Sequence, residues 1–358
     1  MRGAFALIAL LSVFWSCLGY SALKVEQLKS TVDAQKADDF AIPLIVGTPA
    51  NIARRINNAL QYSQLGLIDG AFKESPFENQ DPDNGTTGLG YEVLGQTPQY
   101  LSLLLSSYYM GAYSSADTHP VVFDLHSGDQ IELSDLLTPA GMARVDKRML
   151  RSRLAQIDAF LKVPNTRLTA EGQDGQKDAE IQRRLYLECR AKMVDDKLKR
   201  NEFYLAHGKL TLLQGCDFPH VVLALDDLVE LPYSETFTSL DRDLTPYGHC
   251  LLITRSSRCG LRTASGIHEG LYVGMLDGKW PISLMVLGEG KPFYVDDRYK
   301  QRIPLTLSRP GAGHIVLSSS SGIEGGEEER FDLTVAADGS LSGSWRRRDK
   351  EPVPVILH

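Results

Sequence analysis

The chain has 358 residues, of which 43% are hydrophobic and 23% are charged. This composition excludes a disordered, collagen-like or coiled-coil protein, and the length predicts two domains. Lys and Arg total 38 against 45 Asp and Glu, so the net charge is -7 and the chain lacks the overall basic field with which proteins bind nucleic acid.

The first 22 residues have the three parts of a secretory signal peptide. Arg2 precedes an apolar run over residues 4–15, and small residues follow that run. The run is too short to span a membrane, which takes about 20 helical residues. We therefore predict a signal peptide over residues 1–22, a mature chain without a membrane span, and a periplasmic or secreted location. The alternatives are a buried N-terminal helix and a lipoprotein attached at Cys17, which the bulky residues before that cysteine disfavour.

Four cysteines remain after Cys17 is set aside, namely Cys189, Cys216, Cys250 and Cys259. An even number of cysteines in an exported chain predicts disulfides. We favour the pairs Cys189–Cys216 and Cys250–Cys259, because each pair then lies within one predicted domain. The residues between the second pair are typical of a strand and a turn, so that bridge would close a hairpin. The alternative is four reduced, buried thiols.

The first part of the mature chain predicts strands and helices mixed together. An apolar run over residues 40–46 predicts a strand, and Pro49 followed by Ile52, Ile56 and Leu60 at fourfold spacing predicts a helix to about residue 67. Turn-forming residues are dense over residues 75–90, which predicts an exposed loop and a second candidate binding segment. Further strands are predicted at residues 91–94, 100–110, 121–125 and 130–133.

Two longer helices are predicted next, over residues 141–161 and from residue 181 onward, with a polar loop at residues 163–177 between them. Residues 203–213 predict a hairpin that turns at His207-Gly208. Two short apolar runs, residues 221–225 and 229–231, predict additional strands.

The sequence pattern changes near residues 239–248. Beyond this point short apolar runs separated by Gly, Asp and Ser predict strands at residues 272–276, 282–287, 292–295, 303–307, 314–317, 331–335, 341–345 and 353–357. Regularly spaced short strands without helices predict a small antiparallel barrel or sandwich. We therefore predict an α+β fold, in which residues 23–240 form an antiparallel sheet packed with helices and residues 241–358 form a small all-β domain.

Several motifs in the first domain resemble a known family. The aromatic strand over residues 100–113, and the strand, Phe-Asp-Leu-x-x-Gly turn and helix over residues 120–137, are similar to the core of the DUF3298/DUF4163 (RsiV-like) exported bacterial domains. Residues 202–212 and 229–235 resemble the closing hairpin and final strand of the same domain. The resemblance covers residues 40–240, and the final segment resembles small β modules appended to exported bacterial proteins.

This resemblance implies a protein of the bacterial cell envelope, because such domains occur in lysozyme-sensing anti-sigma factors and in some peptidoglycan deacetylases. The partners it implies are an envelope protein, a lysozyme-like protein or a cell-wall glycan. Family members often carry Gly-Gly-Ala-His after the aromatic strand, whereas this chain has Met110-Gly111-Ala112-Tyr113, and His119 follows six positions later. The metal-binding motifs of the deacetylases have no counterpart in the sequence.

The sequence shows no motif for catalysis. No Gly-x-Ser-x-Gly occurs, and no two of the eight histidines have the spacing of helical metal ligands. The carboxylate pairs Asp226-Asp227 and Asp296-Asp297 would point to opposite faces of a strand, so turn or capping roles are favoured over a glycosidase pair. We expect no catalytic residue, no metal and no cofactor; a metal site assembled around His119 and His126 is the weaker alternative.

The aromatic strand supplies the candidate binding residues. Alternation places Tyr100 and Tyr108 on one face and Tyr109 with Tyr113 on the other, so one pair is expected in the core and the other on the surface. Exposed tyrosines give a large contact area at a small entropic cost, which suits recognition of a protein or a glycan. We predict a ligand-binding surface made of Tyr108, Tyr109, Tyr113 and His119, with core packing as the alternative role of each tyrosine.

Together these features predict an exported, non-catalytic binding or sensing protein of the cell envelope. The alternatives are a cell-wall enzyme or a lysozyme-binding inhibitor, and a structural accessory whose terminal β module docks to another envelope protein.

Overall fold

The structure is a computed structural model of the chain. It describes residues 23–28, 40–47, 49–65, 86–110, 114–163, 172–195, 202–256, 259, 267, 270–286, 292–298, 301–311, 313–319, 328–336, 339–348 and 350–358. The predicted signal peptide over residues 1–22, Tyr113 and most of the predicted loop at residues 75–90 lie outside these residues.

The described chain begins with a two-stranded sheet and one helix. Strand β1 (Lys24–Gln27) pairs antiparallel with β2 (Pro43–Val46), and helix α2 (Ala50–Leu65) follows. The fourfold spacing seen in the sequence buries one face of α2. Asn57 fixes α2 to β2, because its side-chain amide accepts from the N–H of Ile45 (2.7 Å) and donates to the carbonyl of the same residue (3.0 Å).

Three long strands form the central antiparallel sheet, in the order β3 (Thr86–Gln96), β4 (Tyr100–Met110) and β5 (Ser114–Asp124). Residues 86–90 therefore lie in a strand, and the prediction of a loop over residues 75–90 is wrong for this part. Their glycines and threonines suggested a loop, yet they pair with the end of β4 and bury Leu89. Pairing with a strong neighbouring strand outweighs a weak local preference.

A helical hairpin covers one side of the molecule. After the short α3 (Leu133–Leu136) come α4 (Pro139–Lys162) and α6 (Gly172–Asp195). Thr138 caps α4, since its hydroxyl accepts from the N–H of Gly141 (2.9 Å). The start of α6 at residue 172 corrects the prediction of a loop to residue 177, and the predicted strand at residues 130–133 is reduced to one bridge between Phe123 and Gln130.

A second antiparallel sheet contains β6 (Phe203–Ala206), β7 (Lys209–Leu212) and β8 (Tyr233–Thr236). The predicted turn at His207-Gly208 is present, with positive φ at both residues. The apolar run predicted as a strand at residues 221–225 is instead the 3₁₀ helix η2 (His220–Leu225). Pro219 begins it, and its carbonyl accepts from the N–H of Val222 (2.9 Å).

The segment after β8 is helical. It contains the 3₁₀ turn η3 (Asp241–Asp243), helix α7 (Pro246–His249) and the π-helical turn η4 (Cys250–Thr254), so the strand and hairpin predicted between Cys250 and Cys259 are wrong. The Thr245 hydroxyl caps α7 by accepting from the N–H of Gly248. The apolar residues of α7 and η4 pack into the cluster between α3, α4, β4 and β6–β7, which we call the first core.

The structure pairs the four cysteines as the sequence favoured. Cys189 is bonded to Cys216, and Cys250 is bonded to Cys259, with Cα–Cα distances of 5.3 and 5.4 Å. The first bridge ties α6 to the segment before η2, and the second ties η4 to the chain beyond it.

The C-terminal part is one antiparallel, barrel-like sheet, as predicted. Its described strands follow the order β12-β11-β10-β9-β17-β16-β15-β14-β13. They are β9 (Gly270–Leu276), β10 (Trp280–Val286), β11 (Phe293–Asp296), β12 (Gln301–Pro304), β13 (Thr306–Gly311), β14 (His314–Ser318), β15 (Glu329–Val335), β16 (Leu341–Arg347) and β17 (Val353–Leu357). Alternate residues of each strand fill its interior.

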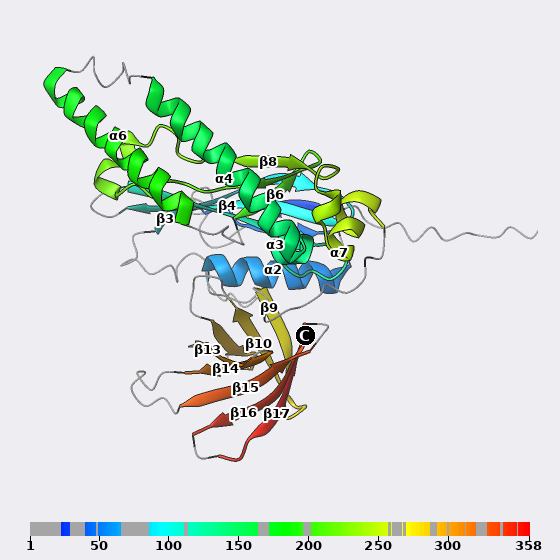
Figure 1. The fold of residues 1–358 in the computed structure, drawn as a ribbon. Coiled ribbons are helices and arrows are strands. Elements are labelled where there is room, and N and C mark those ends of the chain that lie inside the picture. The colour runs from blue at the N-terminus through cyan, green and yellow to red at the C-terminus, as the bar shows by residue number, and fades with distance from the viewer. Residues whose placement is uncertain are drawn as a thin grey trace, which may run out of the picture.

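The elements are stacked in layers (Figure 1). The α4–α6 hairpin lies over the β6–β7–β8 sheet, which lies over β3–β4–β5, and α2 separates that central sheet from the barrel. One apolar cluster joins α2, the central sheet and the outer face of the barrel through Leu271, Met285, Phe293 and Val295. In the described part of the chain, no helix has the length and apolarity that crossing a membrane requires.

Candidate functional site

The central sheet is covered on both faces over most of its length, but its far end is not. Leu101, Leu103 and Leu105 of β4 pack into the apolar cluster over α2. On the other face Tyr100 packs into the cluster under β6, and the Ser102 hydroxyl accepts from the N–H of Leu205 (3.1 Å). Beyond this point the strand leaves both layers, and Tyr108 and Met110 are 47% and 59% exposed. The neighbouring residues 116–119 of β5 are all exposed as well. This end of the sheet is therefore exposed along β4 and β5, whereas Leu89 of β3 is buried.

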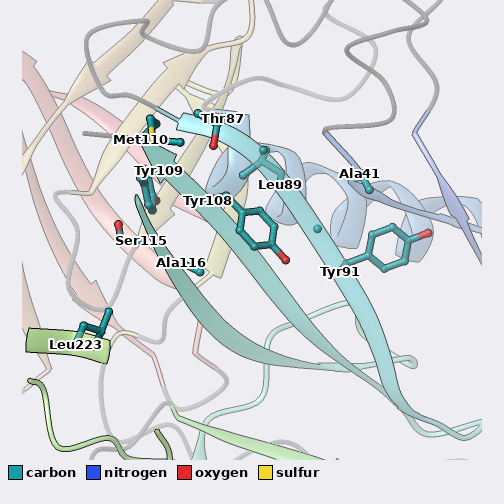
Figure 2. A pocket seen from close by; sticks show the side chains of 12 residues that line it. Ala41, Thr87, Leu89, Tyr91, Tyr108, Tyr109, Met110, Ser115, Ala116 and Leu223 are labelled. Atoms are coloured by element: carbon teal, nitrogen blue, oxygen red, sulfur yellow. The ribbon is translucent and has the colours of Figure 1, made fainter. Parts of the chain in front are cut away.

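A pocket of about 780 Å³ lies at this end of the sheet (Figure 2). Its walls come from β3, β4 and β5, with one residue just before β2 and one from η2. The described residues that line it are Ala41, Thr87, Gly88, Leu89, Gly90, Tyr91, Tyr108, Tyr109, Met110, Ser115, Ala116 and Leu223. This volume is in the range of small-molecule binding sites, about 300–1,000 Å³.

The register of the strands places small residues around Tyr108. Gly88, Tyr108 and Ala116 are direct cross-strand neighbours, so they share one face of the sheet. In the next row Gly90 lies opposite Ser106. The ring of Tyr108 lies across Gly90, where an added Cβ would be 3.7 Å from a ring carbon. Glycine thus provides a floor on which the ring rests, with its other side open to the pocket.

No charged side chain is among the described residues that line the pocket, although 23% of the chain is charged. Polar groups come instead from the hydroxyls of Thr87 and Ser115 and from tyrosines. Burial raises the pKa of Tyr91 above its ordinary value, so this phenol ionises even less readily than a free one and keeps its O–H donor. The pocket offers aromatic faces and neutral hydroxyls.

The predicted binding residues do not all meet at the pocket. Tyr108 and Tyr109 line it, and His119 is exposed on β5 opposite Leu105 but does not line it. Tyr113 lies outside the described residues. Tyr100 shares the face of Tyr108 yet is buried against Phe237. Alternation along the strand therefore does not decide which tyrosine is buried; the position along the strand decides it.

The second candidate binding segment, residues 75–90, includes the lining residues 87–90, although they lie in a strand and not in a loop. Sequence reasoning missed Tyr91, Met110 and Leu223. The Gly-x-Gly of Gly88 and Gly90 was an available signal, since glycine within a strand often marks close approach of another group. No local signal pointed to Leu223, because it reaches the pocket only through the packing of η2.

The two carboxylate pairs, Asp226-Asp227 and Asp296-Asp297, make hydrogen bonds within the fold. Asp226 accepts from the hydroxyl of Tyr186 (2.6 Å) and the N–H of Val229 (3.0 Å), as a turn residue does. Hydrogen bonds from Arg298 lower the pKa of Asp296. Within the described ranges, no three residues of His, Cys, Asp or Glu are grouped in a way that could hold a metal ion.

Comparison with known proteins gives limited information. No family model and no curated protein matches the sequence. Among solved structures, the chain is similar to a crystal structure of a member of the DUF3298 family from Bacteroides fragilis, with 11% sequence identity and a TM-score of 0.39. The match covers 66% of this chain and 98% of that one. A likeness this weak assigns neither family nor function, and the DUF4163 and RsiV-like expectation stays a prediction.

Proposed function

We propose that this chain is an exported protein of the bacterial cell envelope that binds a ligand without transforming it. The observation that carries the proposal is the pocket at the uncovered end of the central sheet, where Tyr108 and Met110 expose much of their surface. Large side chains exposed around a pocket are typical of recognition sites. From the family resemblance we propose an envelope protein, a lysozyme-like protein or a cell-wall glycan as the partner.

The composition of the exposed end supports recognition. Residues 106–109 are Ser-Ser-Tyr-Tyr, and Ser115 and Ala116 lie across from them. Antibody paratopes are rich in the same combination, because tyrosine supplies rigid contact area while serine and other small residues leave room for the partner. The rest of the sheet gives this surface a rigid base.

Export is proposed from two features that agree with each other. The pattern of residues 1–22 is typical of a signal peptide, and disulfides such as Cys189–Cys216 persist in oxidising compartments. Expressing the full chain in a bacterial host and fractionating the cells tests this. We expect a periplasmic or secreted protein whose N-terminus lies near residue 23; a full-length cytoplasmic protein with free thiols would contradict export.

Binding is tested with the immobilised mature chain and envelope material divided into purified cell-wall sacculi and soluble proteins. We expect one fraction to be retained by the wild type and lost by Tyr108→Ala. The matched control is Tyr204→Ala, which removes a half-buried tyrosine of β6 that does not line the pocket. Equal retention by wild type and Tyr108→Ala would contradict the pocket as the site, and release of products from muropeptides would contradict a non-catalytic role.

A further inference from the structure

We propose that the pocket takes an uncharged oligosaccharide, with one sugar ring stacked on the exposed side of Tyr108. This inference rests on the proposed function, because it names the ligand class of the same pocket.

The absence of charge among the described lining residues is the first argument. At the average composition of the chain, about three of twelve residues would be charged, and none is. A ligand with carboxylate, phosphate or ammonium groups would lose hydration on entering and gain no opposite charge from these walls. The chemistry therefore favours a neutral ligand.

The hydroxyl groups are the second argument. Thr87, Ser115 and the neighbouring Tyr108 and Tyr109 bring O–H groups to the same walls as Met110 and Leu223. A purely apolar ligand would cover these hydroxyls without giving them hydrogen-bond partners, which is unfavourable. A sugar ring meets both requirements, since its C–H face is apolar and its edge carries hydroxyls that both donate and accept.

The geometry around Tyr108 is the third argument. Its ring extends from β4 toward β3 (Figure 2). Gly90 of β3 forms the floor beneath the ring, where an added Cβ would lie 3.7 Å from a ring carbon. Tyr108 is 47% exposed, so part of the ring surface is available for stacking. The pocket spans residues from Ala41 beside β3 to Leu223 on η2, so it crosses all three strands of the sheet. A linear chain of sugars fits such a crossing path.

Saturation-transfer NMR with the mature chain and defined tetrasaccharides tests the inference. The uncharged probes are maltotetraose, cellotetraose and N-acetylated chitotetraose; the charged probes are tetragalacturonate and the chitosan tetramer. We expect at least one uncharged probe to bind, with transfer strongest on ring C–H protons, and neither charged probe to bind. Tyr108→Ala should weaken that binding about tenfold or more, while Tyr108→Phe, which keeps the ring, should change it no more than about threefold.

Two further variants separate a lost site from a lost fold. Gly90→Leu should also abolish sugar binding, because a side chain longer than Cβ displaces the Tyr108 ring from its floor. Tyr204→Ala should bind as the wild type does. Thermal unfolding checks that each variant is folded.

The outcomes distinguish this inference from the proposed function. If no uncharged probe binds but a soluble envelope protein is retained by wild type and lost by Tyr108→Ala, the ligand is a protein and the sugar inference is wrong while the function stands. If a charged probe binds better than every neutral one, the argument from charge is wrong. If neither sugar nor envelope material depends on Tyr108, both proposals fall.

Discussion

At the scale of single residues, an ionic network joins α4 to β8 and η3 beside the first core, and no local sequence pattern predicts it. The carboxylate of Asp243 is fully buried and accepts from Arg144 (2.5 Å) and Arg148 (2.8 Å) on α4. Arg148 also donates to both carboxylate oxygens of Glu235 on β8 (2.7 and 3.0 Å). The two arginines lie 87 to 99 positions before their acidic partners in the chain. A buried carboxylate is stable only when it is paired in this way.

Asp243→Asn is predicted to lower stability in a pH-dependent manner. Burial alone would raise the pKa of Asp243, but the hydrogen bonds from Arg148 and Arg144 outweigh burial and hold the pKa below its ordinary value of 3.8. The folded state therefore prefers the charged form, and the stabilisation is present at neutral pH and lost as the pH falls below that value. At pH 7 we expect the variant to lose about 1.5–3 kcal/mol.

Urea unfolding at pH 7 and at pH 3 measures this difference, which should shrink at the lower pH. Asp241→Asn is the control, because Asp241 lies in the same turn with 59% of its side chain exposed, and its carboxylate pairs with His249. A difference between wild type and Asp243→Asn that stays constant with pH would contradict the assigned role.

At the scale of elements, β3 shows that two glycines in one strand serve different purposes. Gly95 lies where β3 crosses β6, and an added Cβ would collide with the backbone carbonyl of Leu205. Gly90 lies in the open part of the same strand, where an added Cβ would make ordinary contacts at 3.7 Å. The first glycine permits two sheets to approach closely, and the second forms the floor of the pocket.

Gly95→Ala is therefore predicted to destabilise the protein by about 1–3 kcal/mol, because one sheet must move to make room for the methyl group. Gly90→Ala, the matched control in the same strand, should change the free energy of unfolding by less than about 0.5 kcal/mol. Chemical denaturation of both variants gives the comparison. Equal effects of the two substitutions would mean that the close approach of β3 and β6 is not what requires glycine at position 95.

Elements also show where sequence patterns fail. The apolar runs at residues 221–225 and 250–254 are too short to distinguish a strand from a helix by periodicity, and both were predicted as strands. In the structure, Pro219 and Thr245 start helical turns ahead of them. The long amphipathic pattern of α4 was predicted correctly because its buried positions recur over many turns.

At the scale of the whole molecule, the barrel shares a core with the first part of the chain. Phe293 of β11 is fully buried and meets Tyr62 of α2 edge to face, with ring centroids 5.6 Å apart. Arg55 of α2 pairs with Asp129 (2.5 Å) and donates to the carbonyl of Leu271 on β9 (3.2 Å). Residues beyond 240 also pack into the first core, among them Tyr247 and Leu251. That residues 23–240 and 241–358 act as separate domains stays a prediction.

Phe293→Ala tests how strongly the two parts are coupled. Removing this ring should cost about 3–5 kcal/mol, because it leaves a cavity in the shared cluster. Hydrogen exchange should show that amide protection falls together in β4 and in β10, since both strands contribute to that cluster. Ile356→Ala, on a 54% exposed position of β17, should have an effect below about 0.5 kcal/mol. Loss of protection in the barrel alone would indicate two independent domains.

The sequence alone determined the kinds of elements wherever a pattern was long or regularly repeated. The α4 helix, the hairpin at His207-Gly208 and the strands of the barrel follow from periodicity and turn chemistry, which act between near neighbours in the chain. Only the tertiary structure decided that Tyr100 is buried while Tyr108 is exposed, and that β3 and Leu223 complete a pocket around it. The physical reason is that burial depends on which layers cover each part of a strand, and those layers come from segments far away in sequence.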